Sequence, residues 1–295
     1  MLAIDWGTSS LRVYRLDANG TVSDVRSSED GILSVKDAAF AATLEHAASE
    51  WLASETPIVM SGMIGSRQGW SEAAYVPCPA GLPEIASALS AVQWTSGDQQ
   101  QHRAWIAPGL SCLDQAGVAD VMRGEEVQIL GILEDLGKGE HVVCLPGTHS
   151  KWARVQDDRI VSFRTHMTGE VFAVLKQHSI LGRTMPTDEF DEAGFVAGVS
   201  RAADPGGLLH HLFGVRSQVL AGNIAEAQSA SYLSGIVIGH ELRAAANEIE
   251  RFHLVGDAAL TALYELAAST MSKTSVIHES GAAPRGLFAL AQYLD

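Results

Sequence analysis

Two short segments of this chain carry nearly the same residues 140 positions apart: residues 7–10 read GTSS and residues 147–150 read GTHS. Each segment follows a short apolar run and precedes alternating residues, which is the pattern of a strand, a tight turn and a returning strand. Such a turn binds anions, because glycine allows close approach and the backbone amides carry partial positive charge. The repeat therefore predicts two related halves that grip a phosphate chain from both sides.

An acid distinguishes the first copy from the second. A single Gly-Thr-x-Ser turn can be an ordinary hairpin connector, but the shared register and the preceding strands favour phosphate binding. Asp5 ends the apolar run before the first turn, where a nucleotide kinase would hold Mg²⁺, usually through water. We therefore predict ATP and Mg²⁺ as cofactors. The predicted phosphate-binding residues are Gly7, Thr8, Ser9, Ser10, Gly147, Thr148, His149 and Ser150.

Composition and charge exclude several classes of partner. The chain has 295 residues, enough for two modest domains, and its net charge is −15 with only 20 lysines and arginines. We therefore expect no nucleic acid as a partner. No apolar run approaches the roughly 20 residues of a membrane helix and no secretion signal is apparent, so we expect no membrane partner. Three separated cysteines without CxxC spacing favour a reducing cytoplasm. Homo-oligomer formation is left open.

Apolar periodicity and turn residues predict a mixed α/β chain without a linker. Residues 2–26 have the pattern of three antiparallel strands, with Asn19-Gly20 as a hairpin turn. The loop 61–70 contains three glycines, which suits a backbone wrapped around a ligand. Further strands are expected at 56–60, 105–107, 141–145, 151–156, 159–165 and 252–256, and helices at 38–53, 124–136, from about 168, 226–249, 257–269 and 282–294.

Six segments follow one another along the chain: IDWGTSSLR, VMSGMIGSRQGW, VMRGEEVQILG, LPGTHSKW, FRTHMTGE and LSGIVIGHEL. Together they resemble the 2-dehydro-3-deoxygalactonokinase family of the actin/hexokinase/Hsp70 superfamily, over residues 2–294. The resemblance implies an α/β fold of two duplicated ribonuclease-H-like domains, the actin-like ATPase fold, flanking a nucleotide cleft. It also implies ATP-dependent phosphorylation of the terminal (6-) hydroxyl of 2-dehydro-3-deoxy-D-galactonate, in galactonate catabolism.

The resemblance also implies how the chain divides. Residues 1–139 would form an N-terminal actin-like domain with the sugar-acid side and the first phosphate turn. Residues 140–295 would form a C-terminal actin-like domain with the second phosphate turn and the adenosine side, where Gly256 opens a helix after a buried strand. The last helix, 282–294, would pack back on the first domain.

Phosphoryl transfer needs groups that position the reactants and neutralise charge, so the predicted catalytic residues are Asp5, Glu125 and Lys151. Lys151 follows the second turn and could pair with the γ-phosphate or the substrate carboxylate, or be a solvated strand residue. Glu125 is chosen as the base for the sugar hydroxyl, in competition with Glu126 and Glu170. Acids at a helix start can also simply favour the helix dipole.

A sugar acid needs a guanidinium that forks its carboxylate. Arg123, near an expected helix N-terminus, ranks first among the candidates, Arg67 ranks second, and Arg164 is the third. Arg12 faces the turn side of its strand and could approach the substrate or form an interdomain ion pair. Trp70 could line the sugar pocket or belong to the core.

Two other functions fit parts of the sequence. One is a phosphoanhydride hydrolase of the same superfamily, which would consume ATP without an acceptor. The other is a non-enzymatic sugar or nucleotide sensor, which would bind ATP without turnover. Fold analogy alone does not decide among them, so a kinase assay with several sugar acids is the deciding measurement.

Overall fold

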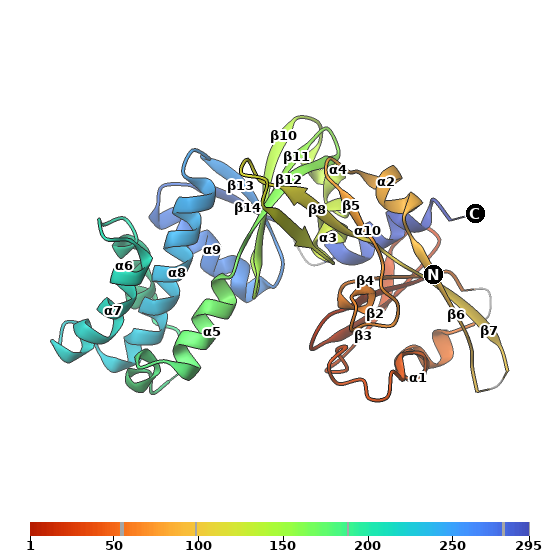
Figure 1. Cartoon of the computed structure of the whole chain (residues 1–295), viewed down its shortest axis with the longest axis horizontal. Helices are drawn as coiled ribbons and strands as arrows, with labels where there is room; N and C mark the ends of the chain where they lie inside the picture. Colours follow the sequence, from red (N-terminus) through yellow and green to blue (C-terminus); the bar gives the residue numbers. More distant parts are fainter. Residues whose placement is uncertain (54–55, 98, 188, 279–280, 295) are drawn as a thin grey trace. The chain divides into compact units, whose positions relative to one another are not determined.

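The computed structural model describes residues 1–53, 56–97, 99–187, 189–278 and 281–294, and the statements below concern these residues. The chain forms two compact units. Unit 1 comprises Met1–His141, Ala153–Phe163 and Gly281–Asp295, and unit 2 comprises Val142–Trp152 and Arg164–Ser280. The predicted domain boundary between residues 139 and 140 stays a prediction, and each unit is described by itself (Figure 1).

Unit 1 is built on a six-stranded sheet of order β3-β2-β1-β4-β7-β6. The first three strands form the predicted antiparallel meander, and β4 continues parallel to β1. A three-stranded sheet of order β5-β8-β9 completes the strands. Their bounds are Leu2–Trp6 (β1), Leu11–Leu16 (β2), Val22–Ser28 (β3), Ile58–Ser61 (β4), Tyr75–Pro77 (β5), Ser90–Thr95 (β6), Gln101–Ile106 (β7), Gly109–Leu113 (β8) and Ala119–Met122 (β9).

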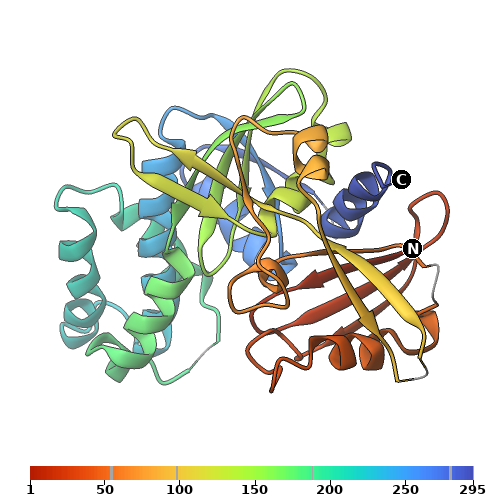
Figure 2. The ribbon, with the colours of Figure 1, turned by 45° about the vertical axis from the view of Figure 1, so that its right-hand side comes forward.

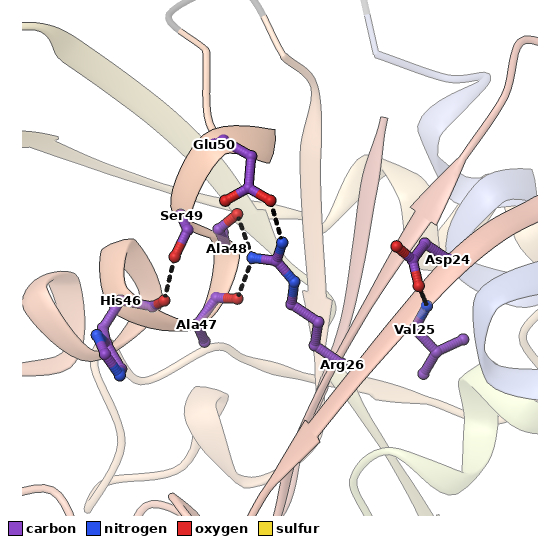
Figure 3. A network of polar contacts seen from close by, with 8 residues as sticks. All are labelled: Asp24, Val25, Arg26, His46, Ala47, Ala48, Ser49 and Glu50. Atoms are coloured by element: carbon purple, nitrogen blue, oxygen red, sulfur yellow. Dashed lines mark hydrogen bonds and ion pairs between the residues drawn. The ribbon is translucent and has the colours of Figure 1, made fainter.

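The core of unit 1 packs β1 against helix α1 (Phe40–Ala48). Arg26 on β3 ties down the end of this helix: its guanidinium donates to the carbonyls of Ala47 and Ala48 at 3.1 and 3.0 Å and pairs with Glu50 (Figure 3). Both carbonyls lie in the last turn of α1, where backbone acceptors have no amide four residues further along the same helix, and the arginine supplies donors to them. It also lies 3.7 Å from the ring centroid of Trp51.

The remaining helices of unit 1 lie around α10 (Ala282–Ala291), which packs against α3, β1 and β4 (Figure 1). The helix predicted at 124–136 is in two pieces, α3 (Glu125–Leu130) and α4 (Leu133–Leu136). A side chain at Gly131, between them, would collide with the Ala282 carbonyl, so glycine permits this close helix packing. The other helices are α2 (Leu82–Ser87) and the 3₁₀ turns Ser49–Trp51 and Met63–Gly65.

The second sheet has five strands in the order β12-β11-β10-β13-β14. Most of its strand residues belong to unit 2, but residues 153–163, in β11 and β12, are counted with unit 1. This order repeats that of β3-β2-β1-β4-β7, so the duplication predicted from the turns extends to the sheets. In both sheets the first strand of a meander has a parallel strand on its other side. The bounds are Glu140–Leu145 (β10), Ser150–Gln156 (β11), Arg159–His166 (β12), Arg251–Val255 (β13) and Thr274–His278 (β14).

Helices make up the rest of unit 2, and their apolar faces form its core with Trp152 and Phe252. Helices α6 and α7 both pack on α8, as Figures 1 and 2 show. The bounds are Thr168–His178 (α5), Glu192–Arg201 (α6), Gly207–Leu220 (α7), Ser229–Ala246 (α8) and Ala258–Thr270 (α9), with 3₁₀ turns at Leu181–Thr184 and Glu226–Gln228. Within the described parts of the chain, no helix is both long and apolar enough to cross a membrane.

Candidate active site

The first phosphate turn connects β1 to β2, as predicted. Its backbone closes on itself, because the Gly7 N–H donates to the Ser10 carbonyl at 2.9 Å. The segment 31–33 backs the turn: the N–H of Ile32 donates to the Gly7 carbonyl at 3.0 Å, and that of Leu33 to the Thr8 carbonyl at 3.2 Å. The side chains of Thr8 and Ser9 are exposed. The turn is therefore held from behind, and its two exposed hydroxyls face solvent.

Asp5 lies beside this turn, in register with Arg12 on β2 and Ser61 on β4. Its side chain is one-fifth exposed and makes a long, 3.4 Å contact with the Arg12 guanidinium. Burial raises the pKa of Asp5; the Arg12 charge and hydrogen bond oppose this shift, and the Glu125 charge adds to it. The carboxylate is thus incompletely compensated, which favours a bound cation.

Two features next to Asp5 fit a hydrated Mg²⁺. A Cβ atom on Gly62 would lie 3.5 Å from Oδ1 of Asp5, so this glycine leaves space beside the carboxylate. Ser61 has a buried hydroxyl for which no hydrogen-bond partner is present in the described part of the chain. Mg²⁺ commonly keeps several waters and binds through one or two carboxylates. The residues present therefore suit such an ion, with Asp5 as the predicted ligand.

The acids of α3 have different environments. The Glu125 carboxylate accepts the Arg123 N–H at 3.0 Å, is half-buried, and its charge acts on Asp5. Glu126 is completely buried and accepts the Gly124 N–H at 2.8 Å. Burial, and then the charge of Glu125, raises the pKa of Glu126 to about 8. Glu126 is therefore mostly protonated at neutral pH.

A contact between two glycines joins this region to Asp5. Gly124 precedes α3 with φ +107°, and a Cβ atom there would lie 3.2 Å from Cα of Gly62. Since Gly62 borders the Asp5 carboxylate, the start of α3 is placed near the end of β1. The sequence shows one half of this contact, because Gly124 stands directly before two acids. It does not reveal that Gly62 is the partner.

Arg123 is only 9% exposed. Its Nη2 donates to the Ala73 carbonyl at 2.8 Å, and its guanidinium lies 4.3 Å from the Tyr75 ring centroid. Its Nε and Nη1 are buried and have no hydrogen-bond partner among the residues that the structure describes. Unpaired buried donors cost on the order of 1–3 kcal/mol each. Gly65 makes room for this group, because a Cβ atom there would lie 3.0 Å from Nη1.

The predicted substrate residues Arg67, Arg164 and Trp70 have other surroundings than Arg123. Arg67 is 87% exposed and pairs with Glu72 at 3.0 Å, and Arg164 is exposed on β12 in unit 2. Trp70 packs between Phe40 and Trp94, at centroid distances of 6.5 and 5.1 Å, against the core of unit 1. The core alternative therefore describes the surroundings of Trp70, and its contact with substrate stays a prediction.

The second phosphate turn connects β10 to β11 in unit 2. Thr148 and His149 are exposed, as are Thr8 and Ser9 of the first turn. Ser150, in contrast, is completely buried, and its Oγ lies 2.9 Å from Oη of Tyr264. This arrangement disfavours the predicted bond from its hydroxyl to phosphate.

Lys151 follows the second turn and is only 5% exposed, so it is no solvated strand residue. The end of its side chain stays at the turn, because its Nζ lies 3.4 Å from the His149 carbonyl. A buried lysine beside the predicted phosphate turn suits the predicted contact with a phosphate.

Helix α5 begins directly behind the second turn. The Glu170 N–H donates to the Thr148 carbonyl at 3.0 Å, and the Glu170 carboxylate pairs with the His149 ring. A side chain at Gly169 would lie 2.6 Å from the Gly147 carbonyl, so only glycine permits this contact. The helix N-terminus adds partial positive charge at the turn. Glu170 thereby has a local partner in unit 2 and is a weaker candidate for the base.

Gly256 joins the same region. It follows β13 with φ +151°, and a Cβ atom there would lie 3.6 Å from the Pro146 carbonyl. The next residue, Asp257, caps α9 by accepting the N–H groups of Ala259 and Leu260 at 2.9 and 3.2 Å. Unit 2 thus brings the predicted adenosine-side glycine next to the second phosphate turn.

The sequence matches the model of the 2-keto-3-deoxy-galactonokinase family over residues 5–290. The chain belongs to this family. It is 39% identical over 273 residues to a protein of Rhizobium meliloti named probable 2-dehydro-3-deoxygalactonokinase, covering 90% of this chain and 87% of that protein. It is 35% identical over 273 residues to the 2-dehydro-3-deoxygalactonokinase of Escherichia coli, covering 92% and 89%.

Solved structures confirm the predicted fold class. A crystal structure from Sinorhizobium meliloti, described as a candidate 2-dehydro-3-deoxygalactonokinase, has a TM-score of 0.90 at 37% identity and covers 99% of this chain and 98% of that one. Component A of (R)-2-hydroxyglutaryl-CoA dehydratase from Acidaminococcus fermentans has a TM-score of 0.51 at 9% identity, covering 99% and 96%, which bears on the fold alone. This chain thus has the α/β fold of actin-like ATPases and sugar kinases.

Proposed function

We propose that this chain transfers the γ-phosphoryl group of ATP to the terminal (6-) hydroxyl of 2-dehydro-3-deoxy-D-galactonate, a step of galactonate catabolism. The observation that carries the proposal is the family match over residues 5–290, which includes both phosphate turns. The geometry within each unit supports it, since each turn is braced from behind and exposes its threonine.

The reaction forms one bond and breaks one. The substrate oxygen bonds to the γ-phosphorus while the bond from phosphorus to the β,γ-bridging oxygen breaks, and ADP leaves. The hydroxyl proton passes to a base, for which we propose the Glu125 carboxylate. Glu125 suits this role because it is half-buried and close enough to act on Asp5 electrostatically, whereas Glu126 already carries a proton at neutral pH.

Charge on the phosphates must be neutralised during transfer. Mg²⁺, when bound with ATP, would supply part of the neutralising positive charge. We propose Asp5 as the acid that holds this ion through water. In unit 1 the turn 7–10 would bind phosphate oxygens. In unit 2 the turn 147–150 would do the same, with Lys151 at the γ-phosphate and Gly256 beside adenosine.

We propose Arg123 as the residue that binds the substrate carboxylate. It is the buried arginine of the three candidates, and its Nε and Nη1 have no partner in the described structure, so the guanidinium keeps donors for a carboxylate oxygen. Arg12 is engaged with Asp5, and Arg67 with Glu72. Since the unpaired nitrogens of Arg123 are buried, we expect the segment 66–75 to shift when substrate binds.

A coupled assay of ADP release tests the proposed function. With Mg-ATP, we expect turnover with 2-dehydro-3-deoxygalactonate well above that with 2-dehydro-3-deoxygluconate, galactonate or glucose. Chelation of Mg²⁺ should abolish it, and added Mg²⁺ should restore it. Equal ADP release with no acceptor would refute the kinase in favour of a hydrolase. ATP binding without turnover on any acid would favour a sensor.

A further inference from the structure

A chain of buried polar groups lies under the second phosphate turn, entirely within unit 2. The Tyr264 hydroxyl, on α9, is 2.9 Å from Oγ of Ser150 and donates to Oε2 of Glu241, on α8, at 2.6 Å. The other carboxylate oxygen, Oε1, accepts the indole N–H of Trp152 at 2.7 Å. These four residues are at most 4% exposed, so one carboxylate deep in the helical core ties together α8, α9 and β11.

The chemistry of these groups fixes the direction of each hydrogen bond. Burial, and then the charge of Glu241, raises the pKa of Tyr264 well above its ordinary value, so the phenol keeps its proton. A phenol has one hydrogen, and Glu241 receives it. The Ser150 hydroxyl therefore donates to Tyr264, at 2.9 Å, in preference to the Gly147 carbonyl at 3.4 Å, and its lone pairs face the Gly147 N–H at 3.4 Å. Ser150 thus has no hydrogen left for a phosphate oxygen.

The position of Ser150 and Trp152 on one strand gives this network its effect on the turn. Side chains two positions apart on a strand point to the same face. Ser150 and Trp152 therefore enter the core together, and both are anchored to Glu241, one through Tyr264 and one directly. Since β11 begins at Ser150, the network fixes the residue at which the turn ends.

We infer that Tyr264 and Glu241 are positioning residues for nucleotide phosphate, which hold the second turn in its binding conformation through Ser150. Both residues are buried in the core, so in this role they act through Ser150 and not by direct contact with the nucleotide. The inference rests on the proposed function to the extent that the second turn binds the phosphates of ATP. It goes beyond that function by assigning a ligand-specific role to two core residues of the helical part of unit 2.

A core residue that only stabilises the fold would weaken every ligand of unit 2 alike. A residue that positions the turn should weaken ligands with phosphates and spare adenosine, which we place at Gly256. Removal of the Tyr264 hydroxyl breaks one neutral and one charge-assisted hydrogen bond. The Ser150 hydroxyl then loses its acceptor and can rotate toward another one. We expect about tenfold weaker binding of a triphosphate, the effect of a single lost hydrogen bond.

The test compares Tyr264→Phe with Tyr232→Phe, a matched control. Tyr232 lies on α8, in the same core and 4% exposed, and the substitution removes the same atom. Isothermal titration would give dissociation constants for the ATP analogue AMPPNP, with Mg²⁺, and for adenosine. We expect Tyr264→Phe to weaken AMPPNP about tenfold and adenosine less than twofold, and Tyr232→Phe to change neither by more than twofold.

Equal losses for AMPPNP and adenosine, or no loss for either, would overturn the inference. If Tyr264→Phe does not fold, Glu241→Gln keeps the shape and one acceptor oxygen, and the same selective loss is expected at reduced size. Failure of the unmodified protein to bind AMPPNP would refute the proposed function itself. Binding without turnover would refute only the kinase, and the positioning role of Tyr264 would still be measured.

Discussion

The two phosphate turns share their glycine, threonine and serine positions, but different structures hold them. The first turn closes through its own backbone, from Gly7 to Ser10, and has Asp5 beside it. The second has Leu145-Pro146 before its glycine and is anchored through the Ser150 side chain to a buried carboxylate. The same local sequence therefore occurs in two environments, one with an acid next to the turn and one with a rigid support beneath it.

This difference suggests a division of work. The two acids that we propose for the reaction belong to unit 1: Asp5, beside the first turn, and Glu125, whose charge acts on Asp5. The second turn has a helix N-terminus behind it and a buried lysine after it, which suit the holding of phosphates. We expect substitutions in unit 1 to act mainly on kcat, and those under the second turn to act mainly on nucleotide affinity.

The largest effect should come from Asp5→Asn. Loss of the carboxylate removes the proposed magnesium acid, and we expect kcat to fall on the order of 10³-fold, with ATP still bound. The measurement is kcat at saturating ATP over a range of Mg²⁺ concentrations. Asp17→Asn, at an exposed turn of the same meander, is the control and should leave kcat unchanged. A near-normal kcat in Asp5→Asn would contradict the proposed difference between the two turns, because Asp5 would then have no role in the reaction.

The next effect separates two neighbouring acids. Glu125→Gln should lower kcat by about 10²–10³-fold, as expected for loss of a general base. Glu126→Gln should keep most of the activity at pH 7, because Glu126 is already neutral there and glutamine can still accept the Gly124 N–H. The two variants differ by one position and are assayed side by side. A larger loss of kcat for Glu126→Gln than for Glu125→Gln would mean that Glu125 is not the base.

Arg123→Met should separate substrate binding from stability. Methionine cannot pair with a carboxylate, so KM for the sugar acid should rise about 10²-fold, the range of a lost charge-assisted hydrogen bond. The free energy of unfolding should change little, because the substitution removes two unpaired buried donors along with the bond to Ala73. Arg67→Met, at an exposed ion pair, is the control. Marked destabilisation with unchanged KM would make Arg123 a structural residue.

The sequence predicted those features that depend on nearby residues. Strand, turn and returning strand were evident from alternation and glycine, and so was the acid at the end of β1. Features that depend on distant residues were not. The bond between Ser150 and Tyr264 joins residues 114 positions apart, and the contact of Gly62 with Gly124 is likewise long-range. The burial that separates Arg123 from Arg67 also arises only in the folded chain.

The helix predicted at 124–136 illustrates the same limit. Its apolar spacing is helical, yet the structure divides it at Gly131, where α10 lies too close for a side chain. Local propensity was correct for each half, and the break lies where the chain approaches a helix 150 residues away, to which Asp135 is tied by its ion pair with Arg285. The sequence pattern around residue 131 does not reveal this distant contact.

The last prediction concerns stability and not activity: a pH dependence of the free energy of unfolding that arises at Glu126. Its pKa is about 8 in the folded chain, against an ordinary 4.5, so between these values the unfolded chain releases a proton that the folded chain keeps. The free energy of unfolding should therefore fall as pH rises from about 5 to 8, by up to about 1.4 kcal/mol per pH unit from this group, and level off above. Urea unfolding at pH 5.5 and 7.5 measures it, with Glu126→Gln as the matched variant. The raised pKa of Asp5 acts in the same direction in both proteins and cancels in their difference. Glu126→Gln should gain stability relative to the parent at the higher pH. Parallel pH profiles of the two proteins would contradict the prediction, because they would mean that Glu126 is ionised in the folded chain.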